Sequence, residues 1–303
     1  GAFTLGFAQG LGTDLSEDAI GNAFDVAEIA IGDIFGLSQL SFSQSIGGDR
    51  FSFELGRLTV GKAFARTEAA LYYVNNGLNG TPSQLSTNLF SFTVEPYNQW
   101  GVYTRYQMDP TRYISAGAYN ASLNAQINAN SGFNFRFNPH DGVLFIAQTG
   151  MFVGQDEGDA TMPGGYHLGG YYDTSDFRLL QDPAETFSGN WGLYALAEQM
   201  VYREENDQGL TVWGALTLAP QQNINTFPIG WNSGFLYKGL FSNRNEDVTA
   251  AALIFGLFSD DLPGQTFELV VEVNHRFQFT DWFYTTLDGQ YVINPNGQTD
   301  IPD

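Results

Sequence analysis

The polar residues that could do chemistry in this sequence alternate with apolar residues and form no compact motif. Glu268, Glu272 and Arg276 stand at even spacing in one such stretch, between Leu, Val and Phe residues. Because successive side chains of a strand point to opposite faces, the alternation places these polar groups on one face. Carboxylates accept hydrogen bonds and guanidinium groups donate them, so this face can bind hydroxyl groups, which do both. The candidates on such faces are Glu54, Tyr103, Arg105, Arg136, Glu198, Glu268, Glu272, Arg276 and Asp288, together with Arg57, whose spacing leaves its direction open.

No spacing typical of an enzyme or of a metal site occurs in the sequence. The histidines His140, His167 and His275 lie far apart and form no pair at metal-ligand spacing, and no nucleophile elbow is present. We therefore predict that the protein is not an enzyme and has no catalytic residue, no metal and no cofactor. A remote alternative is a hydrolase at the rim of a barrel that uses a Ser or Asp with His275.

Alternation with a period of two recurs along the chain and predicts about 14 strands, with turn residues between them and no helical segments or linkers. This pattern indicates a single all-β domain over residues 1–303. Closure into a barrel is the arrangement that we expect, because an open sheet of this size leaves long unpaired edges. The predicted strands are residues 3–8, 37–45, 51–58, 100–107, 113–119, 133–137, 143–149, 166–172, 191–202, 210–218, 231–238, 248–258, 266–279 and 282–292.

Charge is sparse and strongly one-sided, which suits a strand wall in lipid. Charged residues are 15% of the chain, against about 25% in a typical soluble domain, and the net charge is −21. The longest apolar run, residues 250–258, is too short for a membrane helix of about 20 residues but suits a membrane strand. With Lys+Arg at only 12, a nucleic-acid partner is excluded, and the absence of Cys excludes a disulfide scaffold.

Long connections separate some of the predicted strands, and residues 59–88 are the best candidate for a segment that folds inward and narrows the pore. A wide barrel discriminates between solutes only if something fills part of its interior. A disordered external loop is the competing interpretation. The candidate constriction residues are Lys62, Arg66, Glu68, Tyr72, Asn75 and Asn76.

Several short blocks occur in an order that resembles the carbohydrate-selective porins of the OprB type, over residues 50–297. The downstream blocks are GYHLGGYYDTSDF (165–177), WGLY (191–194), QMVYR (199–203), LYKGL (236–240), SDDL (259–262) and QYVINPNG (290–297). ELGRL (54–58) and SAGAYN (115–120) are similar blocks further upstream.

This resemblance implies an outer-membrane barrel of about 16 strands with an inward-folded loop, in a Gram-negative bacterium. Such a pore passes glucose and other small sugars by diffusion. The family's region before Gly1 and its last strand after Asp303 are absent from this sequence, so we expect terminal strands to be missing. The expected partners are small neutral sugars, small ions and outer-membrane lipids, and whether the chain forms a homo-oligomer is left open.

Two alternative functions also fit the sequence. Members of the family differ in whether they favour sugars or small inorganic ions, so a general or cation-preferring pore of the same fold is the first alternative. A barrel with a plugged lumen that acts as a scaffold or adhesin is a remote one.

Overall fold

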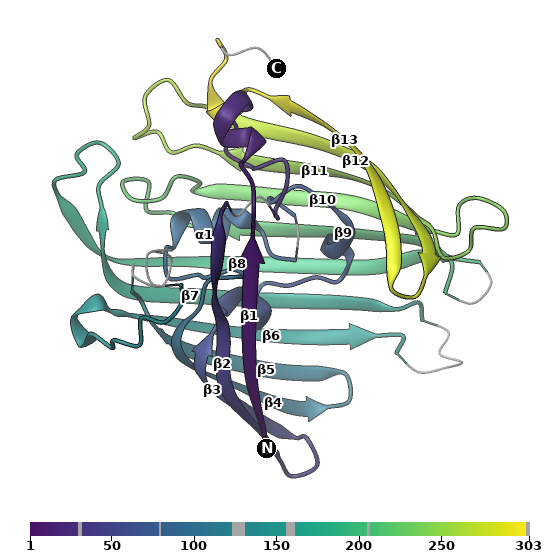
Figure 1. The fold of residues 1–303 in the computed structure, drawn as a ribbon, viewed down its shortest axis with the longest axis horizontal. Helices are drawn as coiled ribbons and strands as arrows, with labels where there is room; N and C mark the ends of the chain where they lie inside the picture. The colour runs from purple at the N-terminus through teal and green to yellow at the C-terminus, as the bar shows by residue number, and fades with distance from the viewer. Residues whose placement is uncertain (30–31, 79, 123–130, 156–160, 205–206, 301–303) are drawn as a thin grey trace.

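The computed structural model describes residues 1–29, 32–78, 80–122, 131–155, 161–204 and 207–300. They contain one sheet of 13 antiparallel strands, in which each strand pairs with its neighbours in the sequence. Figure 1 shows the sheet curving around an interior that holds the connection between β3 and β4. The strands are β1 (Ala2–Gly10), β2 (Ile34–Ile46), β3 (Phe51–Leu58), β4 (Gln99–Asp109), β5 (Arg112–Asn120), β6 (Val143–Val153), β7 (Gly164–Arg178), β8 (Thr186–Arg203), β9 (Gly209–Leu218), β10 (Ile229–Lys238), β11 (Val248–Leu257), β12 (Phe267–Thr280) and β13 (Phe283–Ile293).

Helical structure in the described part of the chain is short and lies in the connections. None of these helices is long and apolar enough to cross a membrane. They are the π-helix η1 (Ser16–Ile20), the 3-10 helices η2 (Val60–Lys62), η3 (Ala69–Tyr72), η6 (Pro139–Asp141) and η7 (Pro295–Gly297), and the α-helix α1 (Ser83–Asn88).

The all-β prediction is confirmed, whereas the prediction of about 14 visible strands is wrong by one. Residues 133–137 alternate as a strand does, but they form none. The physical reason is that β5 pairs directly with β6, from Asn120 opposite Val143 to Arg112 opposite Met151, and so leaves no edge for a strand between them. All the other predicted strands are present.

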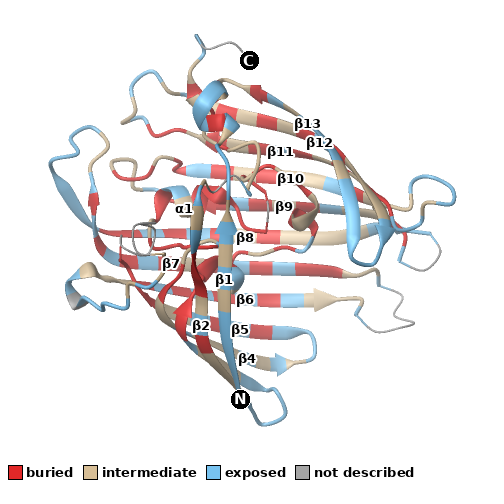
Figure 2. Cartoon of the chain, viewed as in Figure 1, coloured by how far each residue is buried: buried red, intermediate tan, exposed pale blue. Residues whose placement is uncertain are grey.

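The two faces of the sheet differ as the alternation predicts. On β6, Leu144, Ile146 and Gln148 are buried on the concave side, whereas Phe145 and Met151 are exposed on the convex side. The same alternation of buried and exposed residues runs along most strands in Figure 2. Apolar residues on the exposed side are what a barrel wall needs where it contacts lipid.

The connections differ in length at the two ends of the sheet. One end carries short turns at residues 47–50, 110–111 and 281–282, and we call it the short-turn end. The opposite end carries the long connections 11–33, 59–98 and 121–142. Exposed aromatic residues lie on the convex face at the short-turn end, as they do in the interfacial girdles of membrane barrels. They include Tyr106, Tyr166, Tyr202, Phe279 and Trp282.

The interior is packed by the connections themselves. Phe64, Leu89 and Phe92 of the segment 59–98 are fully buried in one cluster with side chains of β6 and β8. Phe24, from the connection between β1 and β2, lies in a second cluster with Phe227. Their rings stack with centroids 5.1 Å apart. Apolar burial therefore holds both connections on the concave face.

Inward-facing tyrosines lie over glycines of the neighbouring strands. Tyr194 on β8 is directly opposite Gly169 on β7, and a Cβ at Gly169 would stand 2.2 Å from Cζ of the Tyr194 ring. Tyr113 covers Gly150 in the same manner, with 2.2 Å to its Cε1. Because glycine has no side chain, the tyrosine rings can lie directly against the backbone of the neighbouring strand.

This arrangement predicts that Gly169→Ala destabilises the fold by about 1–3 kcal/mol, because the added methyl overpacks the Tyr194 ring. The urea midpoint of the purified protein, followed by Trp fluorescence, measures the effect. Gly214→Ala is the matched control, since a Cβ there meets its nearest heavy atom, the Asn232 carbonyl oxygen, at 3.5 Å. Equal midpoints for the two variants would contradict the tyrosine packing.

Candidate functional site

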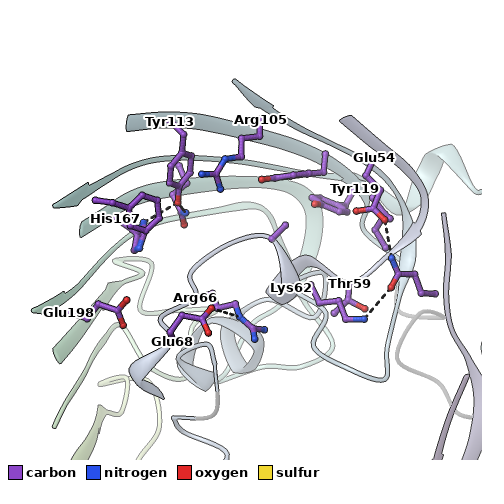
Figure 3. Close-up of a pocket in the computed structure, with 16 residues that line it drawn as sticks. Glu54, Thr59, Lys62, Arg66, Glu68, Arg105, Tyr113, Tyr119, His167 and Glu198 are labelled. Carbon is purple, nitrogen blue, oxygen red and sulfur yellow. Dashed lines mark hydrogen bonds and ion pairs between the residues drawn. The ribbon is translucent and has the colours of Figure 1, made fainter. Parts of the chain in front are cut away.

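A cavity of about 290 Å³ lies between the start of the segment 59–98 and the inward face of β2 to β8 (Figure 3). Its polar lining combines side chains of both charges with tyrosines. Seven of the residues predicted from the sequence meet here, four from the strands and three from the segment: Glu54, Tyr103, Arg105, Glu198, Lys62, Arg66 and Glu68.

Glu54 and Lys62 face each other across one side of the cavity through Gln39. The Glu54 carboxylate accepts hydrogen bonds from Gln39 Nε2 at 2.9 Å and from the Ser41 hydroxyl at 2.5 Å. Lys62 Nζ donates to Gln39 Oε1 at 3.2 Å and forms an ion pair with Glu95 at 2.5 Å. The chain of contacts appears as dashed lines in Figure 3 and orders one carboxylate and one ammonium group.

Arg105 lies over the Tyr113 ring on the opposite side, with its Cζ 3.7 Å from the ring centroid. The Tyr113 hydroxyl contacts His167 Nδ1 at 3.0 Å and accepts from Gln148 Nε2 at 2.5 Å. Gln148 Oε1 in turn accepts the Ala65 N–H at 3.0 Å. This network therefore fixes both the guanidinium group and the backbone of the inserted segment.

Glu198 attaches the next part of the segment to β8. Its carboxylate accepts from the Thr67 hydroxyl at 2.6 Å and from the Ala69 N–H at 3.0 Å. Arg66 and Glu68 flank this contact and lie 3.7 Å apart. Both are solvent-accessible, with 39% and 75% of their side chains exposed, so they present a mixed-charge surface to the cavity.

The cavity continues towards the short-turn end. A second cavity of about 460 Å³ shares Glu68, Phe152 and Glu198 with the first. It also contains Tyr72, another of the predicted constriction residues, and Arg203 near the end of β8. Polar groups thus line both sides of the point where the inserted segment contacts Glu198.

Glu268 and Glu272 face inward on β12, as predicted, but they line neither of these cavities. Both are fully buried. Glu268 accepts the N–H groups of Ala23 and Phe24 at 2.8 and 2.9 Å. Glu272 accepts those of Val74 and Asn75 at 2.8 and 3.1 Å. These carboxylates hold the two connections in place.

Asn75 and Asn76, which were also predicted from the sequence, help to hold the inserted segment near β12. Asn75 donates to the Phe24 carbonyl at 3.0 Å and to Gln290 Oε1 at 2.9 Å. Asn76 Nδ2 donates to an Asp25 carboxylate oxygen at 3.0 Å. They therefore join the inserted segment to the connection between β1 and β2.

Arg276 links the end of η3 to the wall. Its Nη2 donates to the Leu71 carbonyl at 3.0 Å, and its Cζ lies 4.5 Å from the Tyr72 ring centroid and 4.3 Å from that of Tyr284. Asp288, on β13, is exposed and accepts a hydrogen bond from Gln290 at 2.8 Å.

Arg57 and Arg136 lie away from both cavities. Arg57 is buried and donates to the Asn98 side chain at 2.6 Å and to the Asn98 carbonyl at 2.9 Å. It also binds the carbonyl of Asn134. Arg136 is exposed in the segment 133–137. Its placement on an inward strand face is wrong because that segment is not a strand.

Several lining residues were not predicted. Tyr113, Tyr119 and Gln148 share the inward face of their strands, so alternation could have identified them. His167 also faces inward on β7 and lines the cavity. Within the described ranges, no group of three or more His, Cys, Asp or Glu residues could hold a metal ion.

The family profile described as "Carbohydrate-selective porin, OprB family" matches residues 2–303. The chain belongs to the OprB family. This confirms the resemblance found in the sequence and the predicted location in the outer membrane of Gram-negative bacteria. The family is one of porins and not of enzymes.

One curated relative is distant in sequence. Porin B of Pseudomonas aeruginosa is 23% identical over 242 residues, which are 68% of this chain and 52% of Porin B. The chain therefore spans about half the length of this curated relative.

Solved structures show the same fold. The high-pH structure of Pseudomonas putida OprB matches with a TM-score of 0.89 and 20% identity, over 99% of this chain and 79% of that one. The low-pH structure of the same protein matches with a TM-score of 0.56 and 17% identity, over 86% and 64% of the two chains. The chain thus has the OprB fold, a β-barrel.

Glu28 makes the folding stability of the protein depend on pH. It lies in the connection between β1 and β2, where its N–H donates to the Val74 carbonyl at 3.0 Å. Burial, reinforced by Glu95 and opposed by Arg66, raises the pKa of Glu28 from 4.5 to about 7. Because the folded state keeps this proton at a pH where the unfolded chain has lost it, stability falls as pH rises from 4.5 to 7.

The thermal unfolding midpoint of the wild type should decrease between pH 5 and pH 8. We therefore expect this decrease to be smaller in Glu28→Gln. Differential scanning calorimetry of the wild type and the variant at both pH values measures this. Glu17→Gln is the control, because Glu17 is exposed in the same connection. A decrease of the same size in Glu28→Gln and in the wild type would contradict the assignment.

Proposed function

We propose that this protein forms a water-filled pore through which small neutral sugars such as glucose diffuse passively across the outer membrane. The mixed-charge cavity beside the inserted segment is the observation that carries the proposal. Membership of the OprB family supports it. In this proposal residues 1–303 act as a single domain within a closed barrel of about 16 strands, and the segment 59–98 forms the constriction.

The chemistry of the cavity suits a sugar better than an ion. Glu54, Glu68 and Glu198 accept hydrogen bonds, whereas Lys62, Arg66 and Arg105 donate them. Three acidic and three basic side chains leave the cavity with little net charge. It therefore does not favour a charged solute over a neutral one. Each hydroxyl of a sugar can find a donor and an acceptor within one cavity.

Aromatic rings add a second kind of contact. The rings of Tyr103 and Phe152 line the same cavity, next to the Tyr113 ring that Arg105 covers. Such rings pack against the apolar C–H face of a sugar while its hydroxyls bind the charged groups. The combination favours sugars over small zwitterions, which have no comparable apolar face.

A cation-preferring pore of the same fold is the second candidate. The net charge of −21 creates a field that attracts cations to the mouths of a pore. Reversal potentials in planar bilayers distinguish the two proposals. Strong cation selectivity that added glucose leaves unchanged favours the second.

Glu54→Gln and Arg105→Gln each test the sugar path. We expect each to slow glucose entry in liposome swelling by about tenfold or more, since a hydrogen bond to a charged group contributes about 1.5–3 kcal/mol. Glu246→Gln is the control, because Glu246 is an exposed carboxylate that lines neither cavity.

Two results would overturn the proposal. Swelling of wild-type proteoliposomes no faster than that of protein-free liposomes would exclude a sugar pore. Equal rates in all three variants and the wild type would place the sugar path away from the cavity.

A further inference from the structure

A pocket of about 780 Å³ opens on the convex face of the sheet, away from the sugar cavity. Its walls come from the connection 239–247 and mainly from outward positions of β11, β12 and β13, and Asn274 and Asp288 of the inward face also border it. It lies at the short-turn end, which faces the periplasm in outer-membrane barrels. The outward residues that line it are mostly apolar: Val273, Phe277, Phe279, Leu287 and Gly289.

A polar cluster lies at the edge of this apolar pocket. Asp247, whose side chain is 2% exposed, accepts from Arg244 Nε at 2.7 Å and from Arg244 Nη2 at 2.8 Å. It also accepts the Gln278 N–H at 2.9 Å and contacts His275 Nε2 at 3.4 Å. His275 Nδ1 contacts the Thr249 hydroxyl at 2.8 Å. Charged groups are costly on a face that contacts lipid, so a donor that the Arg244–Asp247 pair leaves open favours a polar ligand.

Arg244 has a donor left for such a ligand. Nε and Nη2 bind Asp247, whereas Nη1 has no hydrogen-bond partner among the residues that the structure describes. The side chain is 38% exposed at the pocket edge. Because Asp247 already accepts three hydrogen bonds and contacts His275, the outward side of the guanidinium group can bind an anionic oxygen.

Aromatic rings surround this donor at the level of an interfacial girdle. The Arg244 Cζ lies 5.8 Å from the Phe277 ring centroid and 5.6 Å from that of Phe279. Phe241 packs edge-on against His275 with centroids 5.3 Å apart. Trp282, in the adjacent turn, is 83% exposed. Such rings lie at lipid headgroup depth in membrane barrels.

We propose that this pocket binds a glycerophospholipid of the periplasmic leaflet. Arg244 Nη1 binds an oxygen of the phosphodiester, and an acyl chain lies along Val273, Phe277 and Leu287. A phosphodiester supplies the negative charge that the guanidinium group lacks on its open side. The apolar part of the pocket accommodates the acyl chain. One lipid molecule therefore contacts both the polar and the apolar part of the site.

Native mass spectrometry of the full chain, purified in detergent and titrated with phosphatidylglycerol, tests the proposal. We expect one lipid to remain bound to the wild type and its affinity to fall about tenfold in Arg244→Gln, as the loss of one charge-assisted hydrogen bond predicts. Gly289→Leu should reduce binding as well. A Cβ at Gly289 meets only the Val273 carbonyl oxygen, at 3.9 Å, so the side chain enters the pocket without disturbing Arg244.

Arg112→Gln is the matched control. Arg112 pairs with Asp109 at 2.6 Å in another turn at the same end, in the same i,i+3 arrangement, but lines no part of this pocket. Equal lipid retention in all three variants would overturn the proposal. So would equal retention of diacylglycerol, which lacks the phosphate, or displacement of the lipid by equimolar inorganic phosphate. A change in oligomeric mass without a change in lipid retention would identify the pocket as a contact between copies.

Discussion

The interior of this protein depends on carboxylates that accept backbone N–H groups from segments inserted on the concave face of the sheet. A connection that leaves the strand ladder and enters the interior carries donors that water no longer satisfies. Glu268 and Glu272 each accept at least two such N–H groups, and Glu198 accepts one together with the Thr67 hydroxyl, all from residues far away in the sequence. Without these contacts the apolar packing of Phe24 and Phe64 would hold the segments but not fix their position.

These contacts divide the carboxylates of the barrel wall into two groups. Glu268 and Glu272 are buried and fix the connections, whereas Glu54 and Glu68 keep access to the cavity. Glu198 does both, because it binds the segment and lines both cavities. The proposed sugar path therefore passes the point of attachment, so that the shape of the constriction and its chemistry depend on the same side chain.

The strands and their faces were predictable because alternation is a local property of the sequence. It correctly placed Glu54, Arg105 and Glu272 on the inward face. It could not show that Glu268 binds Ala23, which precedes it by 245 residues, because such contacts depend on how the connections fold. Residues 133–137 are the opposite case, because their local pattern predicts a strand that does not form. Their alternation is local, but a strand also needs a free edge, and the pairing of β5 with β6 removes it.

Single-channel conductance of the double variant Glu198→Ala/Glu272→Ala in planar bilayers tests the central claim most directly. Both substitutions remove carboxylates that hold the segment 59–98 on the wall, at Ala69 and at Val74. The account predicts a conductance larger than that of the wild type and a weaker block by added sugar, because the segment no longer narrows the pore. An unchanged conductance with unchanged block by sugar would contradict it.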